Sequence, residues 1–258
     1  MTEVAASAQP TASLPGGVIR SPWGVWISIL WVVAAEGLRD AVDLGMDHSP
    51  LHALDQQSYL AHVLVITLSW ATPLIVLVVA VRLAQWSIGE YFAFVFPRGR
   101  DIALAIAVGL ALEVAGHTLA YVLGGTTSFP VEDYQAQIAA GTWAGWYVLH
   151  YWPASIYAPL VEETIYRGFL WRGLAASRLG NGGALLITSF LFAAVHYRYY
   201  IQDGTFLPGA FLSPFLSGLV FGWIRWRTGS TIAAMITHST SNTALNIGTV
   251  MAVKLGWP

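Results

Sequence analysis

The stretch YLAHVLVITLSWATPLIVLVVAVRLA, at residues 59–84, is a long apolar run that contains a single arginine, Arg82. About 20 consecutive apolar residues are enough for one helix to cross the hydrocarbon core of a bilayer. Similar runs occupy residues 22–38, 102–124, 143–175, 183–200, 208–226 and 230–252. The sequence therefore predicts an all-α fold, a polytopic bundle of transmembrane helices.

The composition supports a membrane protein and excludes several other classes. Of 258 residues, 56% are hydrophobic and 10% are charged, whereas soluble domains carry about 25% charged residues. The net charge of −2 is too small to favour a nucleic-acid partner. Because the chain has no cysteine, disulfides and thiolate catalysis are excluded.

The number of crossings depends on the fourth run, 143–175, which is too long for one plain helix. Pro153 and Pro159 are expected to break it. The break leaves an interfacial piece near 142–150 and a spanning helix near 151–175. The bundle then has seven spanning helices, or eight if both pieces cross.

The charges of the loops predict the orientation of the chain. Most arginines fall on one side of a seven-crossing arrangement, and the positive-inside rule assigns that side to the cytoplasm. Residues 85–100 and 176–182 are then cytoplasmic loops, and residues 125–141 lie outside. Residues 1–21 are a disordered cytoplasmic tail, rich in Ala, Ser, Thr and Pro, and residues 22–258 form a single transmembrane domain.

The fourth run contains charges near the middle of its predicted spanning helix. These are Glu162, Glu163 and Arg167, and a charge at such a depth costs about 2.5–3.5 kcal/mol on insertion scales. Glu163 and Arg167 are four residues apart, so they share a helix face and can pair. Glu162 points about 100° away. Glu162 is therefore the carboxylate left free for chemistry, although a charge cluster that only holds helices together is an alternative.

Two further runs carry isolated polar side chains. His196 lies in the fifth run, and His238 and Asn242 share one face of the seventh, four residues apart. A single buried histidine is usually a packed core residue. Three helices that each present an acid, a base or an amide are a different case, because a water held within a membrane needs polar partners that lipid cannot supply. The pattern predicts a water-activating site.

Three short motifs follow one another along these helices: Glu162-Glu163…Arg167, Phe192…His196 and His238…Asn242. They resemble the EExxxR, FxxxH and HxxxN motifs of the CAAX prenyl protease and bacteriocin-processing (CPBP) family of intramembrane proteases, and the flanking residues are similar to its bacterial branch. The resemblance covers a protease core at about residues 150–245. It implies an intramembrane endopeptidase of the bacterial inner (plasma) membrane that acts on a membrane-associated peptide or protein.

The resemblance also implies four catalytic residues, Glu162, His196, His238 and Asn242, and two supporting residues, Glu163 and Arg167. Glu162 and His196 would hold and deprotonate the water that attacks the scissile carbonyl, and such general-base help is worth about 10²–10⁴-fold. His238 and Asn242 would donate hydrogen bonds to the oxyanion. The supporting pair would hold in place the helix predicted near 151–175, which carries the first motif and is called the motif helix below.

Other interpretations remain open at this point. Two histidines and a glutamate also suit zinc, but the sequence has no HExxH pair, so we expect no cofactor and keep zinc as the alternative. Glu113 and His117, four residues apart in the third run, could relay protons in a transporter or form a packing pair. A transporter would be favoured by an inverted repeat, and none is visible. A non-catalytic scaffold would be marked by loss of motif residues, and all of them are present.

Overall fold

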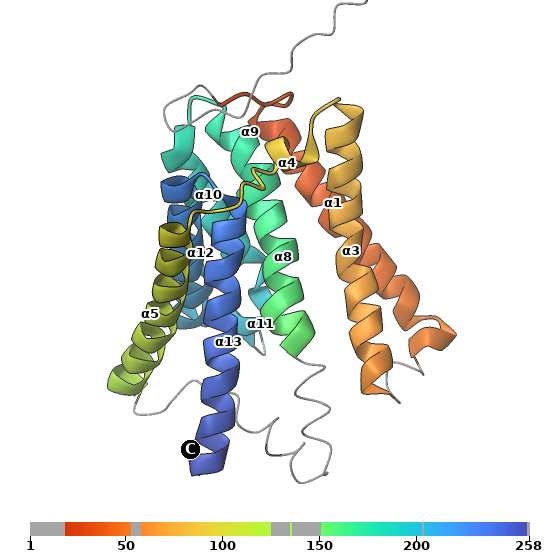
Figure 1. Cartoon of the computed structure of the whole chain (residues 1–258). Coiled ribbons are helices and arrows are strands. Elements are labelled where there is room, and N and C mark those ends of the chain that lie inside the picture. The colour runs from red at the N-terminus through yellow and green to blue at the C-terminus, as the bar shows by residue number, and fades with distance from the viewer. Residues whose placement is uncertain (1–18, 53–57, 125–134, 136–150, 203, 257–258) are drawn as a thin grey trace, which may run out of the picture.

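The structure is a computed structural model that describes residues 19–52, 58–124, 135, 151–202 and 204–256. The chain has an all-α architecture (Figure 1). Its long helices are α1 (Val25–Asp47), α3 (Tyr59–Leu83), α5 (Gly99–Gly124), α10 (Gly180–Val195), α12 (Pro208–Thr228) and α13 (Thr231–Leu255). Its short helices are α4 (Ile88–Tyr91), α8 (Ala158–Glu163), α9 (Trp171–Ala175) and α11 (Tyr197–Tyr200).

Residues 151–175 form one helical path, so the helix predicted there is present, and its crossing of the membrane stays a prediction. Two π-helical segments, η1 (Trp152–Tyr157) and η2 (Thr164–Leu170), alternate with α8 and α9 along it. Pro153 and Pro159 lie inside this path and do not end it, so the prediction that they break the run is wrong for residues 151–175. A proline removes one backbone donor, and a wider turn accommodates the lost bond.

Two of the described helices are long and apolar enough to cross a membrane, namely Leu60–Leu83 of α3 and Gly99–Leu119 of α5. Gly180–Val195 is apolar but shorter. Large apolar side chains are exposed along α3, among them Leu60, Leu64, Leu68, Ile75 and Val79. Exposed apolar surface of this extent fits contact with lipid. The count of seven or eight crossings stays a prediction.

Several predicted segments lie outside the described residues. They are most of the tail 1–21, the interfacial piece 142–150 and all of the outer loop 125–141 except Gln135.

Helix α1 is longer than its apolar run predicts, because it continues past residue 38 to Asp47. The extension carries several charges, which pair along the helix. The Arg39 guanidinium lies 2.7 Å from the Glu36 carboxylate, three residues earlier. Pairs at this spacing stabilise a helix, and an apolar run alone does not reveal them.

Helix α10 is shorter than predicted, because it ends at Val195 and not near residue 200. The N–H of His196 bonds to the carbonyl of Ala193, only three residues earlier, which tightens and closes the last turn. After α11 the chain forms a small antiparallel pair of strands, β1 (Ile201–Gln202) and β2 (Thr205–Phe206). His196 therefore lies at a helix end.

The long helices pack in pairs, α10 with α12, α13 with α5, and α1 with α3. In Figure 1, α1 and α3 lie together on one side and lean away from α8 toward the lower end. Gly218 and Gly222 of α12, four residues apart, permit the close approach of α10. A Cβ added at Gly218 would lie 3.0 Å from the Ser189 Cα, and one added at Gly222 would lie 2.6 Å from Leu185.

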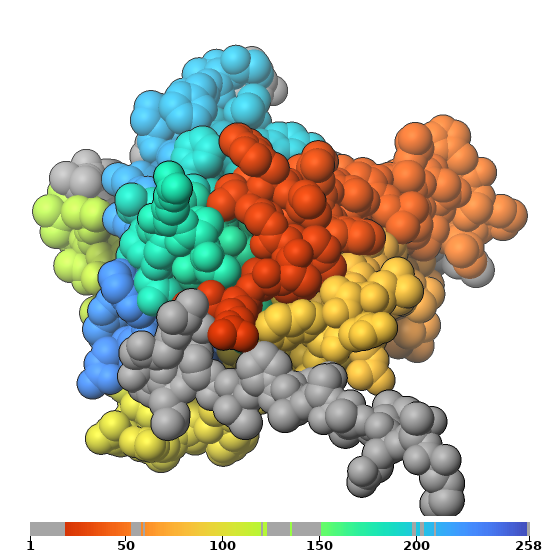
Figure 2. Space-filling model, turned by 90° about the horizontal axis from the view of Figure 1, so that it is seen from above, coloured from red at the N-terminus to blue at the C-terminus, as the bar shows by residue number. Residues whose placement is uncertain are grey.

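At one end of the bundle, Arg172 connects α9 to two other segments. Its guanidinium donates to the carbonyls of Glu90 and Arg20, at 3.0 and 3.2 Å, and lies 4.8 Å from the centre of the Trp86 ring. Figure 2 views this end from above and shows the start of the described chain, in red, beside the segment around α9. These contacts fix the upper end of α1 against the helix that carries the charged motif.

The contact between α1 and α9 can be tested at Gly173, where a Cβ would lie 1.9 Å from the Ser28 hydroxyl. We expect Gly173→Ala to force the helices apart, to cost about 1–3 kcal/mol and to lower the melting temperature in detergent. Gly182→Ala is the matched control, because a Cβ there meets no atom within 4 Å. Ser28→Gly should restore the stability of Gly173→Ala. Equal melting temperatures for the two alanine variants would refute the close contact.

Candidate active site

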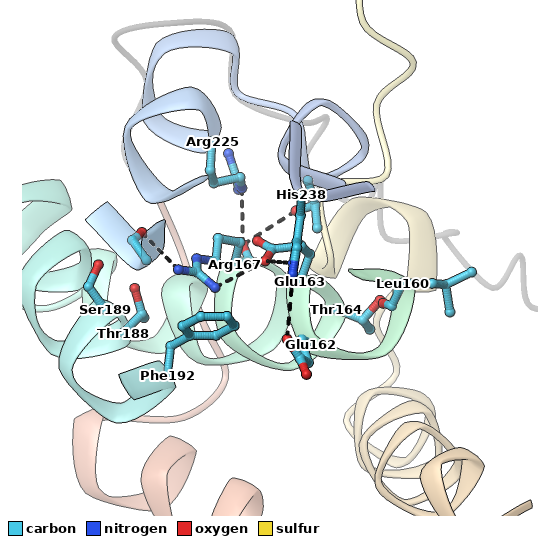
Figure 3. Close-up of polar contacts among 12 residues, drawn as sticks. Leu160, Glu162, Glu163, Thr164, Arg167, Thr188, Ser189, Phe192, Arg225 and His238 are labelled. Atoms are coloured by element: carbon cyan, nitrogen blue, oxygen red, sulfur yellow. Dashed lines mark hydrogen bonds and ion pairs between the residues drawn. The ribbon is translucent and has the colours of Figure 1, made fainter. Parts of the chain in front are cut away.

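Glu163 is the centre of a buried polar cluster between three helices (Figure 3). Its Oε1 atom lies 3.1 Å from the Nη1 atom of Arg167 and 3.0 Å from Nδ1 of His238. The Glu163–Arg167 ion pair that the spacing predicts is thus present, and both side chains are fully buried. The bond to His238 was not predicted, and it joins the motif helix to α13.

Arg167 is held by groups from the neighbouring helices. Its Nη2 atom donates to the carbonyl of Gly218 at 2.8 Å, and its guanidinium lies 4.7 Å from the centre of the Phe192 ring. The carbonyl of Arg167 accepts bonds from Arg225 at 3.0 Å and from Thr231 at 3.3 Å. Gly218 therefore does more than permit close packing, because its carbonyl is a partner of the buried cation.

His238 has a fixed ring orientation. An ionised Glu163 can only accept, so the Nδ1 atom of His238 carries the hydrogen of that bond. The ring of Phe221 stacks on the imidazole with 4.4 Å between centroids, and the Phe192 ring meets it edge-on at 5.8 Å. Held in this way, the imidazole directs Nε2 toward Glu162.

Glu162 differs from Glu163 in its surroundings. Its Oε2 atom lies 3.9 Å from Nε2 of His238, which is too far for a direct hydrogen bond. Its side chain is 17% exposed, while that of Glu163 is completely buried. Oε1 of Glu163 accepts two hydrogen bonds within the buried cluster, and Glu162 is the more exposed of the two carboxylates.

His196 lies next to the cluster, at the end of α10. Its Nδ1 atom is 2.6 Å from the carbonyl of Phe192, which assigns the hydrogen to Nδ1 and leaves Nε2 as an acceptor in the neutral ring. The rings of His196 and Phe192 have centroids 4.7 Å apart. Because Phe192 also touches His238, it separates the two histidines while contacting both.

Asn242 lies one turn beyond His238 on α13. Its amide nitrogen donates to the carbonyl of Ala154 in η1 at 2.7 Å. Asn246, a further turn along, donates to the Ser155 hydroxyl at 2.9 Å. One amide hydrogen of Asn242 is therefore engaged by backbone, and the second is left for another acceptor.

Glu113 and His117 pair on α5, with 3.4 Å between His117 Nε2 and Glu113 Oε2. The same carboxylate accepts a hydrogen bond from the Ser241 hydroxyl. Ser241 is buried on α13, three residues after His238. The pair on α5 is thus hydrogen-bonded to α13 through Ser241. This contact between helices supports the packing interpretation over a proton relay.

Sequence reasoning missed the ring of Phe221 and the backbone partners of this cluster, and it included Phe192 only as a residue of the second motif. Phe221 carries no polar signal, so nothing in the spacing relates it to His238. The four-residue spacing of Gly218 and Gly222 is compatible with close helix packing, but it does not indicate that the Gly218 carbonyl accepts a bond from Arg167. Within the part of the chain that the structure describes, no group of three or more His, Asp and Glu side chains is placed to hold a metal ion.

Residues 144–244, about two fifths of the chain, match the family model described as Type II CAAX prenyl endopeptidase Rce1-like. This part of the chain is an Rce1-like domain. It contains every motif residue from Glu162 to Asn242, and it identifies the protein as a membrane peptidase. Searches of curated proteins and of solved structures find no match to the chain. Membership of a bacterial branch stays a prediction.

The buried pair of the Rce1-like domain can be tested for its effect on folding. Arg167→Ala leaves Glu163 buried without its guanidinium, and breaking such a pair costs about 3–5 kcal/mol. We expect a large loss of monodisperse protein in detergent, measured by size-exclusion chromatography. The double variant Glu163→Gln/Arg167→Met leaves no unpaired charge and should recover part of the yield. Arg178→Ala is the exposed control, and equal yields for it and Arg167→Ala would contradict the role of the pair.

Proposed function

We propose that the protein is an intramembrane endopeptidase that hydrolyses a peptide bond with a water activated by Glu162. The observation that carries the proposal is the position of Glu162, a reachable carboxylate 3.9 Å from Nε2 of His238. The other nitrogen of that ring is fixed by the buried Glu163. A reactive carboxylate beside an oriented imidazole is an arrangement suited to general acid–base catalysis. The proposed substrate is a membrane-associated peptide or protein.

We assign His196 to the activation of water together with Glu162. With its hydrogen on Nδ1 and directed to Phe192, the neutral ring has its lone pair at Nε2. This nitrogen can accept a hydrogen bond from a water that Glu162 deprotonates. Attack on the carbonyl carbon then forms a tetrahedral oxyanion, and its collapse expels the amine, which takes up the proton from Glu162.

His238 and Asn242 are the proposed donors to the oxyanion. Because Nδ1–H of His238 is committed to Glu163, Nε2 donates when the ring is an imidazolium, and the Glu163 carboxylate stabilises that form. The amide hydrogen of Asn242 that is not bonded to Ala154 is the second donor. Removing one such donor from other enzymes costs about 3–4 kcal/mol of transition-state stabilisation.

We further propose that the reaction needs no metal ion and that the N-terminus faces the cytoplasm from a bacterial plasma membrane. In this proposal the side chains of Glu162, His196 and His238 supply the acid and the base. The arginines on the predicted cytoplasmic side support the orientation. A zinc-dependent reaction and a non-catalytic scaffold are the alternatives that the two tests below distinguish.

The first test replaces Glu162, the residue on which the proposal depends. Glu162→Gln keeps the shape of the side chain and removes its basicity, so we expect turnover of a peptide reporter in proteoliposomes to fall by about 10²–10⁴-fold. The melting temperature should stay close to that of the wild type. Asp47→Asn, which changes a 67% exposed carboxylate on α1, is the matched control. Near-normal turnover by Glu162→Gln would refute water activation by this residue.

The second test concerns metal dependence. We expect the purified enzyme to keep its full turnover after incubation with excess chelator and dialysis. Elemental analysis of the active sample should show less than one zinc for each chain. Activity that is lost on chelation and restored by added Zn²⁺ would favour the zinc-dependent alternative.

A further inference from the structure

Tyr166 is a buried tyrosine of the motif helix whose hydroxyl has no role in the cluster described above. It lies in η2, four residues after Glu162, and is 2% exposed. Its hydroxyl makes no hydrogen bond to any described residue, and, unlike the hydroxyl of Tyr91, it is not fully enclosed. A buried phenol usually has a hydrogen-bond partner. A hydroxyl that has none within the described chain, and that borders accessible space, points to a ligand.

The ring of Tyr166 packs among the aromatic surroundings of the proposed catalytic residues. It meets the Phe192 ring edge-on, with 5.6 Å between the centroids. The Phe192 ring also lies 4.7 Å from the ring of His196 and 5.8 Å from that of His238. Tyr166 therefore contacts the side chain that separates the two histidines.

Helix geometry directs the Tyr166 side chain toward Glu162. The two residues lie on either side of the junction between α8 and η2. Four residues exceed one α-turn by about 40° and fall slightly short of one π-turn, so both geometries place Tyr166 on the face of Glu162. Helical side chains lean toward the N-terminus of their helix, so the Tyr166 ring extends back over the turn that carries Glu162.

Tyr166 and Asn242 lie on opposite sides of Glu162 along the motif helix. Asn242 bonds to the carbonyl of Ala154, which precedes Glu162 in the chain, whereas Tyr166 follows it. His238 approaches Glu162 between these two positions. The proposed donors to the oxyanion are His238 and Asn242. A donor on the other side of Glu162 is therefore placed for a different carbonyl of the same peptide.

We propose that the Tyr166 hydroxyl binds the substrate, by donating a hydrogen bond to a backbone carbonyl next to the scissile bond. The inference rests on the proposed function of Glu162. A peptide within the membrane loses its hydrogen bonds to water, and lipid cannot replace them, so its carbonyls need donors from the enzyme. Every peptide carries such carbonyls. The contact thus fixes the position of the substrate backbone and does not select its side chains.

The first measurement is the kinetics of Tyr166→Phe in the full-length enzyme in proteoliposomes. The variant loses the hydroxyl and keeps the ring, so we expect kcat/KM for the peptide reporter to fall about tenfold. Tyr91→Phe is the matched control, because it removes another buried phenol hydroxyl, in α4, and should keep wild-type kinetics. A ring that only packs works equally well as phenylalanine, so an unchanged kcat/KM for Tyr166→Phe overturns the inference.

A structural role of the hydroxyl has a different signature. Because no described residue bonds to it, its removal should leave the yield and the melting temperature of Tyr166→Phe at the wild-type values. A loss of folded protein in Tyr166→Phe that Tyr91→Phe does not share would show that the hydroxyl supports the fold. That result also overturns the inference.

The second measurement identifies the carbonyl. In a series of reporters, each peptide bond near the scissile bond is replaced in turn by a trans-alkene, which keeps the shape and removes the carbonyl. With the wild-type enzyme, one of these reporters should lose about tenfold in kcat/KM through this contact. With Tyr166→Phe, that reporter should lose nothing further, since the two changes remove the same hydrogen bond. If every alkene costs the same in both enzymes, the inference is overturned.

The outcome for Tyr166 is distinguishable from the outcome for the proposed function. If Glu162→Gln is inactive while Tyr166→Phe keeps wild-type kinetics, the inference about Tyr166 fails alone. If Glu162→Gln remains active, the proposed function fails, whatever the Tyr166 variant does.

Discussion

The structure depends on one fully buried carboxylate, that of Glu163. Its bonds to Arg167 and His238 join the motif helix to α13, and Arg167 continues the connection to the backbone of α12. A buried charge is tolerated only when its partners are close and well oriented. The relative positions of three helices are therefore coupled to the orientation of one imidazole ring. Packing of apolar side chains alone would leave that ring free to turn.

The geometry of the motif helix directs two adjacent carboxylates, those of Glu162 and Glu163, into different surroundings. Glu162 and Glu163 close α8, directly before the π-helical segment η2. Wider turns of this kind are frequent at functional sites because they change the direction of side chains without ending a helix. Glu163 is directed into the bundle and Glu162 toward a position that a ligand can reach. Glu163 thus stabilises the packing of the helices, and its neighbour Glu162 is the carboxylate proposed to react.

Much of this could be predicted from spacing, and the exceptions have physical causes. The four-residue interval predicted the Glu163–Arg167 pair, and apolar length predicted the helical path 151–175. The bond between Glu163 and His238 could not be predicted, because 75 residues separate them and only the packed helices define the distance. The length of α1 was missed because charges end an apolar run without ending a helix. Two of the described helices are long and apolar enough to cross a membrane, so the predicted seven or eight crossings stay a prediction.

The cluster of Glu162, Glu163, Arg167 and His238 also has a simple charge balance. Two ionised carboxylates and one guanidinium leave a net charge of −1 when the imidazole is neutral. A low-dielectric interior favours an uncharged assembly, and one proton, on His238 or on Glu162, makes the sum zero. The two sites lie 3.9 Å apart. Under the proposed mechanism, the charge balance of this buried cluster and the acceptance of a proton from the attacking water therefore involve the same two side chains.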